Sequence, residues 1–169
     1  GSYVSCEEPD VWVAEESAEA GRVIGVINIG RRVVYVNGAP RQLRYGHDLR
    51  IDPAHRGGML LHRIFRRLRQ ELGHGEWMQT VILDGNDASL STVGSGRAGM
   101  PTYYPHGEIE THLVYTGKRR PVSHHDGIVV RRADAADLQE MQSYLDEEAR
   151  HRQFFPRYRL DRLLAEDRY

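Results

Sequence analysis

The sequence predicts an α/β (α+β) fold in which a mixed, mostly antiparallel twisted sheet is flanked by helices. The first fifty residues alternate short β-branched runs with turn residues, as antiparallel strands do. Residues 60–72 then carry apolar side chains at helical spacing, and strand-like and helical segments follow. With 169 residues, 40% of them apolar, the chain can bury a core around such a sheet.

The charges and the rare residues exclude several classes of protein. The 23 basic and 24 acidic side chains give a net charge of −1, so no overall field attracts nucleic acid or an anionic membrane. Lys118 is the only lysine, which argues against Schiff-base chemistry, and Cys6 is the only cysteine, which excludes an internal disulfide. No apolar run approaches the ~20 residues that cross a bilayer. The sequence predicts a cytoplasmic protein without a metal site, a nucleic-acid partner or a membrane partner.

The N-terminal part is predicted to be an antiparallel β meander. Gly1-Ser2 without an initiator methionine is typical of an expression-tag remnant, so residues 1–10 are set apart as a tag remnant and N-terminal segment. The dipeptide Asn37-Gly38 is a strong signal for a tight hairpin. Strands are expected over residues 10–16, 22–29, 33–36 and 41–51.

Helical and strand patterns alternate after the meander. An amphipathic helix is expected over residues 60–72 and a strand over residues 77–83. A short helix or loop follows over residues 84–101, and the polar–apolar alternation of residues 108–115 predicts a half-buried strand.

The C-terminal part begins after a predicted linker, residues 117–126, which is polar and contains Gly and Pro. Ile128 to Val130 then predict a strand, Asp134 is the expected cap of a helix, and a further helix is expected from Pro156.

The most informative segment is the junction between a strand and the amphipathic helix. Arg56, Gly57 and Gly58 follow a proline turn and immediately precede the helix. Glycines let backbone N–H groups converge, the helix N-terminus carries partial positive charge, and an arginine adds a full charge. The junction predicts a phosphate or pyrophosphate site, with a simple tight turn beside a solvated arginine as the alternative.

Over residues 11–115 the chain resembles the GNAT superfamily of N-acetyltransferases. The likeness rests on the meander, the strand–Pro–x–x–Arg–Gly–helix segment, and an Asn after the next strand. The chain departs from the family's usual Arg-Gly-x-Gly-x-Gly pattern at Gly58-Met59-Leu60-Leu61, which shortens the predicted phosphate-binding loop. The residues that match the family motif are Ile51, Pro53, Arg56 and Gly57.

The resemblance implies acetyl-CoA as cosubstrate, no metal, and a set of cofactor contacts. The strand before the loop would hold the pantetheine through its backbone, and the loop amides would bind the pyrophosphate. Asn86 would contact the pantetheine, or is simply a turn residue. The implied cofactor-binding residues are Leu49, Arg50, Ile51, Arg56, Gly57, Gly58, Met59, Leu60 and Asn86.

The resemblance also implies catalytic residues. His47 takes the base position that some members occupy with histidine, and Asp48 lies beside it; the alternative is a structural histidine. Strand alternation places His47 and Leu49 on one face and Asp48 on the other. The family's acid position falls near Val93, which cannot donate a proton. Tyr103 or Tyr104 is the candidate acid instead; the alternatives are a tyrosine of the core or surface, with the proton coming from solvent.

Two further groups of side chains have more than one interpretation. Glu108, Glu110 and His112 share one strand face and would receive a cationic acceptor, although such a row is typical of a solvated face. His124-His125 lack a third ligand within the predicted linker, which argues against a metal site.

The domain organisation follows from the resemblance. Residues 11–116 form an acetyltransferase-like domain that lacks the family's first strand and helices. Residues 127–169 resemble the start of a second such domain, or supply the missing part of the first in permuted order. A second acetyltransferase domain or a homodimer is therefore an expected partner.

The expected function is acetyl transfer from acetyl-CoA to a small amine or an amino-terminal group. The alternative is a catalytically silent acetyltransferase-like scaffold or acyl-CoA-binding domain, which Val93 and the altered glycine loop favour. A nucleic-acid binder is disfavoured, because no aromatic residues alternate with the arginines.

Overall fold

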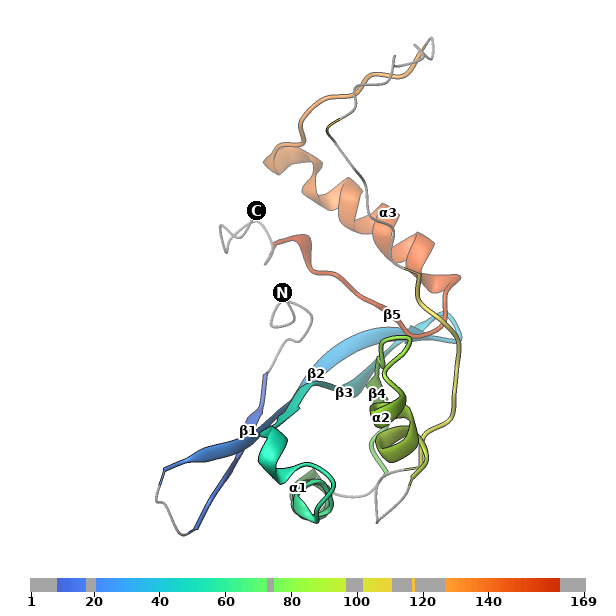
Figure 1. Cartoon of the computed structure of the whole chain (residues 1–169). Helices are drawn as coiled ribbons and strands as arrows, with labels where there is room; N and C mark the ends of the chain where they lie inside the picture. The colour runs from blue at the N-terminus through green and yellow to red at the C-terminus, as the bar shows by residue number, and fades with distance from the viewer. Residues whose placement is uncertain are drawn as a thin grey trace.

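The computed structural model of the chain describes residues 9–17, 21–72, 75–96, 102–110, 117 and 127–161 (Figure 1). Its strands form one five-stranded sheet in the order β1-β2-β3-β4, with β5 paired to β2. The first three strands are antiparallel, whereas β4 runs parallel to β3. The predicted mixed, mostly antiparallel sheet flanked by helices is confirmed. The strands are β1 (Val11–Glu15), β2 (Val23–Val36), β3 (Ala39–Ile51), β4 (Met78–Thr80) and β5 (Phe155–Pro156).

β2 and β3 form a long hairpin on which the rest of the fold is built. Asn37 (φ 50°) and Gly38 (φ 76°) make its two-residue turn. Left-handed conformations at both positions match the right-handed twist of the flanking strands, so the predicted hairpin is confirmed. The two strands expected over 22–29 and 33–36 are one strand, because residues 30–32 continue the ladder with β3.

α1 (Leu60–Leu72) covers one face of the sheet, as its apolar stripe predicts. Phe65 and Leu68 of α1 are buried against Ile27 and Ile29 of β2. Burying one such side chain stabilises the fold by about 1.5–3 kcal/mol. This core fixes α1, and therefore the loop that precedes it, against the sheet.

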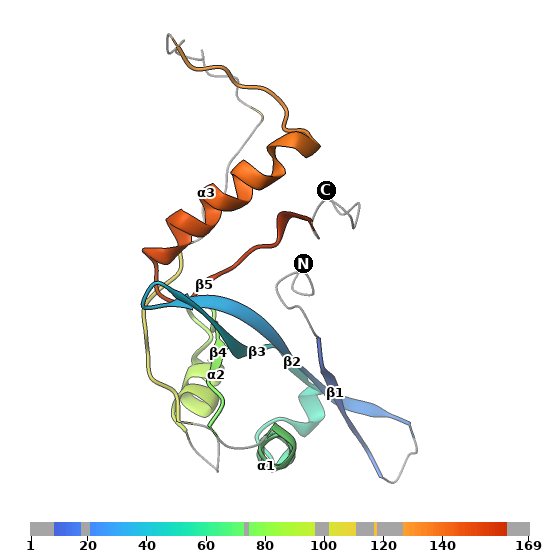
Figure 2. The same ribbon diagram turned by 180° about the vertical axis from the view of Figure 1, so that it is seen from behind.

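The short α2 (Asp87–Ser89) continues into a π-helical turn (Leu90–Gly94), and both lie on the same side of the sheet as α1 (Figure 2). Val93 of that turn is buried in the core that α1 covers. The strand expected over residues 77–83 is found only as β4, because the chain leaves the ladder after Thr80.

α3 (Leu138–Arg150) follows directly on a 3₁₀ turn (Ala135–Asp137), and Asp134, the residue predicted to cap the helix, is the N-cap of that turn. Oδ1 of Asp134 accepts a hydrogen bond from the Ala136 amide at 2.8 Å, and Oδ2 of Asp137 accepts one from the Asp134 amide at 2.9 Å. This reciprocal arrangement is a capping box, so the expected cap is confirmed. α3 rises from the tip of the β2–β3 hairpin, away from α1 and α2 (Figures 1 and 2).

A charged clip ties α3 and β5 to β2. The Arg157 guanidinium donates two hydrogen bonds to the Asp146 carboxylate, at 3.2 and 2.8 Å. These bonds lower the pKa of Asp146, and burial together with a hydrogen bond to that carboxylate raises the pKa of Tyr35. Nearby, Gln153 and Asn37 exchange hydrogen bonds of 3.0 and 3.1 Å.

Three predicted elements differ in the structure. Ile128 to Val130 form no strand, and Val130 is 92% exposed, because no described strand supplies a ladder partner. Residues 108–110 are likewise not a strand, and residues 111–115 lie outside the described part. The helix expected from Pro156 begins only at Leu160, because the Arg157 amide donates to the Val33 carbonyl at 2.9 Å and so prolongs the sheet.

No helix within the described ranges is long and apolar enough to cross a bilayer.

Candidate functional site

The site begins at a β-bulge in β3. Asn28 of β2 pairs with His47, but Val26 pairs with Arg50, so two residues of β3 lie opposite one residue of β2. The first of the two, Asp48, has a φ of 54°, which is the left-handed conformation expected in one type of bulge. The ladder is therefore interrupted at Asp48 and Leu49, and Leu49 is the first of the positions predicted to hold pantetheine.

The bulge reverses the alternation of β3. Leu49 packs against the core that α1 covers, whereas His47 pairs with Asn28 on the opposite face. The predicted sharing of one face by His47 and Leu49 is therefore wrong, because the extra residue shifts the side-chain period by one.

The His47 side chain is held from two sides. Its Nδ1 lies 2.9 Å from Oδ2 of Asp48, and its ring stacks on Tyr45 with centroids 5.3 Å apart. The side chain is only 7% exposed. A carboxylate at Nδ1 favours the tautomer with the proton on that nitrogen, which leaves Nε2 as the proton acceptor.

β3 and β4 separate beside the bulge. They pair over three positions only, from Arg44 with Met78 to Gly46 with Thr80. At the last pair the Thr80 hydroxyl donates to the Gly46 carbonyl at 2.8 Å. Residues 47–51 of β3 continue without a described partner from β4, so this edge can accept an extended ligand.

A short 3₁₀ turn, Pro53–His55, leads from β3 toward α1. Oδ1 of Asp52 accepts from the Ala54 amide at 2.8 Å, and this bond keeps the pKa of Asp52 below its usual value. Nε of Arg56 donates to the Ile51 carbonyl at 3.1 Å, across the turn. The arginine thus lies beside the end of β3, where the separated edge meets the loop.

The loop ends in the two glycines before α1. Gly57 has a φ of 75°, a left-handed conformation that glycine adopts without strain, and no atom lies within 4 Å of an added Cβ. Met59 is exposed, and Leu60 begins the helix. No acidic residue occurs in the first turn of α1, so its amide groups face no competing carboxylate of that turn.

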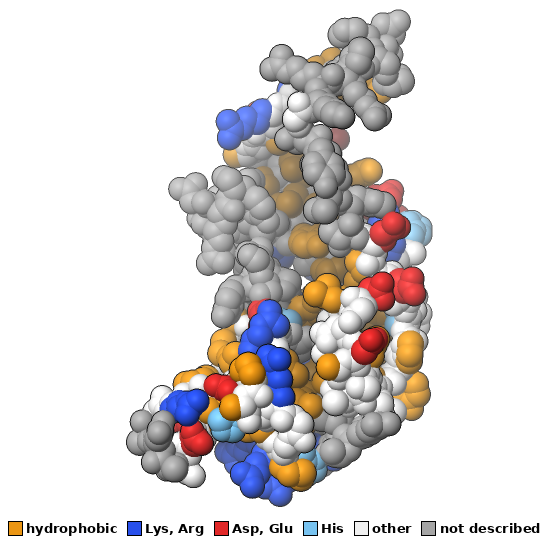
Figure 3. Space-filling model, viewed as in Figure 1, with side chains coloured by type: hydrophobic (Ala, Val, Ile, Leu, Met, Phe, Trp, Pro, Cys, Tyr) orange, Lys and Arg blue, Asp and Glu red, His pale blue; other side chains and the backbone are white. Residues whose placement is uncertain are grey.

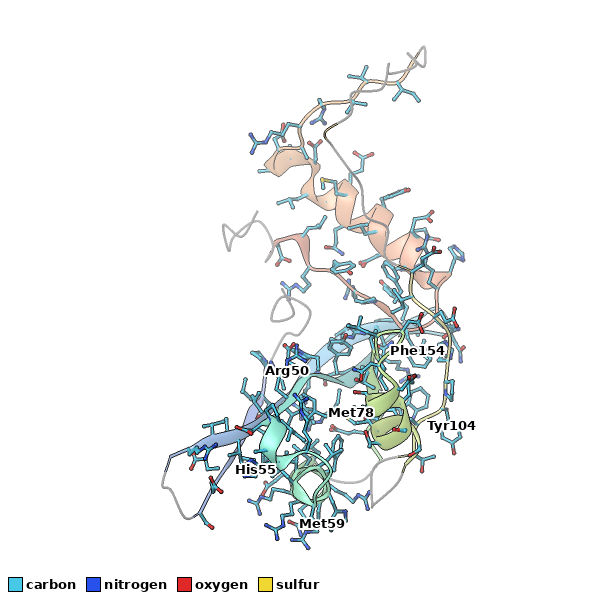
Figure 4. All side chains as sticks on the ribbon, viewed as in Figure 1. Arg50, His55, Met59, Met78, Tyr104 and Phe154 are labelled. Carbon is cyan, nitrogen blue, oxygen red and sulfur yellow. The ribbon has the colours of Figure 1, made fainter. Side chains whose placement is uncertain are left out.

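The structure brings most of the predicted residues together and leaves others apart. His47, Asp48 and the loop from Leu49 to Leu60 are contiguous around the bulge and the start of α1. Asn86 caps α2, with its Oδ1 accepting from the Ser89 amide at 3.2 Å. Tyr104 is 85% exposed and is drawn apart from Arg50 and Met59 (Figure 4).

The remaining candidates form no described site. Glu108 and Glu110 are exposed on an irregular segment, and His112, His124 and His125 lie outside the described residues. Within the described ranges no three His, Cys, Asp or Glu side chains cluster to hold a metal.

Sequence reasoning named His47 but missed the side chains that surround it on the sheet face opposite α1, a group that we call the polar cluster. It consists of Asn28, Arg32, Tyr45, His47 and Gln79. The Arg32 guanidinium donates a hydrogen bond to the side-chain oxygen Oε1 of Gln79. It also lies over the Tyr45 ring, 3.7 Å from the ring centroid. Polar residues at alternate positions of the apolar β2 run were the only sequence signal for it.

Two other surface features lie near α1. A cavity of about 410 Å³ opens between β1, β2 and α1, with Ile24, Ile27 and Ile64 among its lining residues. Basic side chains gather at the end of the molecule where α1 lies (Figure 3). The exposed arginines of that helix are Arg63, Arg66, Arg67 and Arg69.

Comparisons with known proteins give likeness to solved structures only. The sequence matches no family model and no curated protein sequence. A mutant of a Bacillus halodurans protein is 20% identical, with a TM-score of 0.48, over 65% of this chain and 70% of that one.

Two other similar structures are acetyltransferases of the AAC(6') type. AAC(6')-Iy, in complex with a CoA-containing bisubstrate analogue, is 16% identical with a TM-score of 0.44 over 64% of this chain and 72% of that one. The aminoglycoside antibiotic 6'-N-acetyltransferase AAC(6')-Ig from Acinetobacter haemolyticus is 15% identical with a TM-score of 0.44, over 63% and 72% of the two chains. The chain is thus similar, over roughly two thirds of its length, to acetyltransferase structures of low sequence identity.

Proposed function

We propose that the protein is an acetyl-CoA-dependent N-acetyltransferase acting on a small amine or an amino-terminal group. The observation that carries the proposal is the separation of β3 from β4 beside a bulge, directly before a glycine loop and a helix N-terminus. An extended chain with amide groups fits the free strand edge, and a pyrophosphate fits the loop.

On the donor side, Leu49, Arg50 and Ile51 present backbone groups at the separated edge. The amides from Arg56 to Leu60 and the Arg56 guanidinium would bind the pyrophosphate, because the loop combines a left-handed glycine, a helix N-terminus and a positive charge. Acetyl-CoA supplies the thioester-activated acetyl group. Asn86 has its amide nitrogen left to donate while its oxygen caps α2.

On the acceptor side, His47 would remove the proton. The amine nitrogen forms the new C–N bond to the acetyl carbon, the C–S bond breaks, and the amine proton passes to Nε2 of His47. Asp48 stabilises the charge that the imidazole gains. Tyr104 is 85% exposed, and we assign protonation of the leaving thiolate to water.

A silent acyl-CoA-binding scaffold is the second candidate. Val93 stands near the position where the resembled family often carries its acid, and here it is buried in the core. A protein of this kind would bind acetyl-CoA without transferring the acetyl group.

Calorimetric titration of the chain with acetyl-CoA tests the proposal. Saturable binding is expected, and Arg56→Glu should weaken it at least about tenfold, since it replaces an attractive charge with a repulsive one at the loop. Arg66→Glu makes the same charge change on the exposed part of α1 and is the control. Equal binding by all three proteins would overturn the pyrophosphate assignment, and binding without release of thiol to any amine would favour the scaffold.

A further inference from the structure

The Asn28 side chain is buried with neither of its polar atoms hydrogen-bonded. The residue is 2% exposed, and both Oδ1 and Nδ2 lack a partner within the described structure. A buried donor or acceptor left unsatisfied costs about 1–3 kcal/mol. An apolar residue like the neighbouring Ile27 and Ile29 would avoid this cost, so the amide calls for a partner that binds from outside.

Asn28 lies next to the proposed base. It is the cross-strand partner of His47 on the face of the sheet away from α1. Side chains so paired have Cβ atoms about 4.5–5.5 Å apart. Since Asp48 holds Nδ1 of His47 at 2.9 Å, the orientation of the imidazole beside Asn28 is set.

We propose that Asn28 binds the acceptor and selects amines that carry an oxygen on the second carbon, an N–C–C–O unit. This inference rests on the proposed acetyl transfer. Oδ1 accepts an N–H of the amine, and Nδ2 donates to the oxygen of the acceptor. One ligand then satisfies both atoms that are unsatisfied in the free protein.

The chemistry of the carboxamide limits the acceptor to this class. An asparagine presents one acceptor and one donor group side by side in a plane, and the N–C–C–O unit offers the complementary pair. A plain alkylamine would engage Oδ1 and leave Nδ2 buried without an acceptor. The unit occurs in two sources: amino-terminal residues, where the oxygen is a carbonyl, and amino alcohols or amino sugars, where it is a hydroxyl.

Kinetics with three matched amines test the proposal. Glycinamide carries the carbonyl form, ethanolamine the hydroxyl form, and propylamine neither; thiol release from acetyl-CoA gives kcat/KM for each. The wild type should favour at least one oxygen-bearing amine over propylamine. Asn28→Leu should reduce this preference about tenfold or more, because the oxygen-bearing amines lose their contacts with both Oδ1 and Nδ2, whereas propylamine loses only its contact with Oδ1. The oxygen-bearing amine whose kcat/KM falls more in Asn28→Leu identifies which of the two sources supplies the acceptor.

Stability gives a second, independent measurement. Asn28→Leu should unfold at a higher temperature than the wild type, since it replaces an unsatisfied amide with an apolar group of the same heavy-atom branching. Gln42→Leu removes an exposed carboxamide from β3 and is the control, expected to leave the preference among amines unchanged. If the leucine variant does not fold, two measurements replace it. The first is the amine kinetics of Asn28→Ala, and the second is the NMR shift of the wild-type Asn28 side-chain amide resonances when glycinamide is added.

The outcomes separate this inference from the proposed function. Acetylation of all three amines with the same preference in wild type and Asn28→Leu, or unshifted amide resonances, would overturn the role of Asn28 alone. A wild type that binds acetyl-CoA but acetylates no amine would overturn the transfer reaction and the acceptor role together. Failure to bind acetyl-CoA would overturn the donor site as well.

Discussion

Oδ2 of Asp48 lies 2.9 Å from Nδ1 of His47, the residue directly before it on β3. Adjacent side chains of a regular strand point to opposite faces, so such neighbours do not normally meet. The φ of 54° at Asp48 breaks the regular strand, and the carboxylate and the imidazole come into contact there. An irregularity of the backbone therefore provides the proposed base with its carboxylate partner.

His47→Ala should lower the rate of amine acetylation about 100-fold or more near neutral pH, since a positioned base contributes about 10²–10⁴-fold. The ratio of the wild-type rate to the variant rate should fall as pH rises, because the amine is then already deprotonated by solvent. Initial rates of thiol release across the pH range measure both effects. A loss that is the same at every pH would argue against His47 as the base.

Asp48 should tolerate glycine better than valine. A left-handed φ costs a non-glycine residue roughly 1–2 kcal/mol and costs a β-branched residue more. Denaturant titration should therefore find Asp48→Gly close to the wild type in stability and Asp48→Val clearly below it. If Asp48→Gly is as inactive as His47→Ala, the carboxylate itself is needed; equal stability of both Asp48 variants would contradict the strained bulge.

Gly57→Ala should lower both stability and acetyl-CoA affinity, by about 1 kcal/mol in stability, because its φ of 75° disfavours a side chain. Gly58→Ala is the matched control, since Gly58 has no positive φ and the nearest atom to an added Cβ lies 3.9 Å away. Thermal unfolding and calorimetry with acetyl-CoA compare the two variants. Identical behaviour would mean that the glycine conformation does not shape the loop.

Asp146→Asn should destabilise the protein by about 1–2 kcal/mol, because it removes the charge that binds Arg157 and the Tyr35 hydroxyl. Glu147→Gln, one position along α3, removes exposed ion-pair contacts with Arg150 and His151 and should cost less than about 0.5 kcal/mol. Urea unfolding of the two variants makes the comparison. A larger loss of unfolding free energy in Glu147→Gln than in Asp146→Asn would contradict the stabilising role of the Arg157–Asp146 pair.

The Asp146 effect should depend on pH in a defined direction. Its pKa is lowered in the folded protein, so the carboxylate stabilises the fold above its unfolded pKa of about 4 and ceases to do so as pH falls through the folded value. Tyr35 has a raised pKa, so its contribution is present below about pH 10 and is lost at higher pH. The difference in unfolding free energy between wild type and Asp146→Asn should shrink in acid. A difference that stays constant with pH would mean that the charge of Asp146 does not stabilise the clip.

The sequence predicted those parts of the fold whose signals are local. The hairpin at Asn37-Gly38, the stripe of α1 and the cap at Asp134 each depend on a few neighbouring residues, and all three are confirmed. Ile128 to Val130 has the composition of a strand but no described partner, and a strand needs a partner that local sequence does not specify.

The candidate site was predictable in its loop and not in its strand. Arginine and glycines before a helix are a local pattern, so Arg56 and Gly57 could be proposed from the sequence alone. The bulge at Asp48 depends on register with β2, and one extra residue changed the face of Leu49. Asn28 was missed because its meaning comes from its burial beside His47, which no run of neighbouring residues encodes.

The pairing of β5 with β2 has a consequence for how the protein forms. Asn37 and Gln153, which exchange hydrogen bonds, are 116 positions apart in the chain. Bringing these residues together costs loop-closure entropy, and the hairpin must form before its edge can pair with β5. Contacts between residues so far apart in the sequence slow folding. During synthesis the hairpin and α1 can assemble early, whereas this edge of β2 near Val34 and Tyr35 waits for Phe155 and Pro156, which are synthesised much later. Until then this edge is open to strands of other chains, so the nascent protein is most prone to aggregate there.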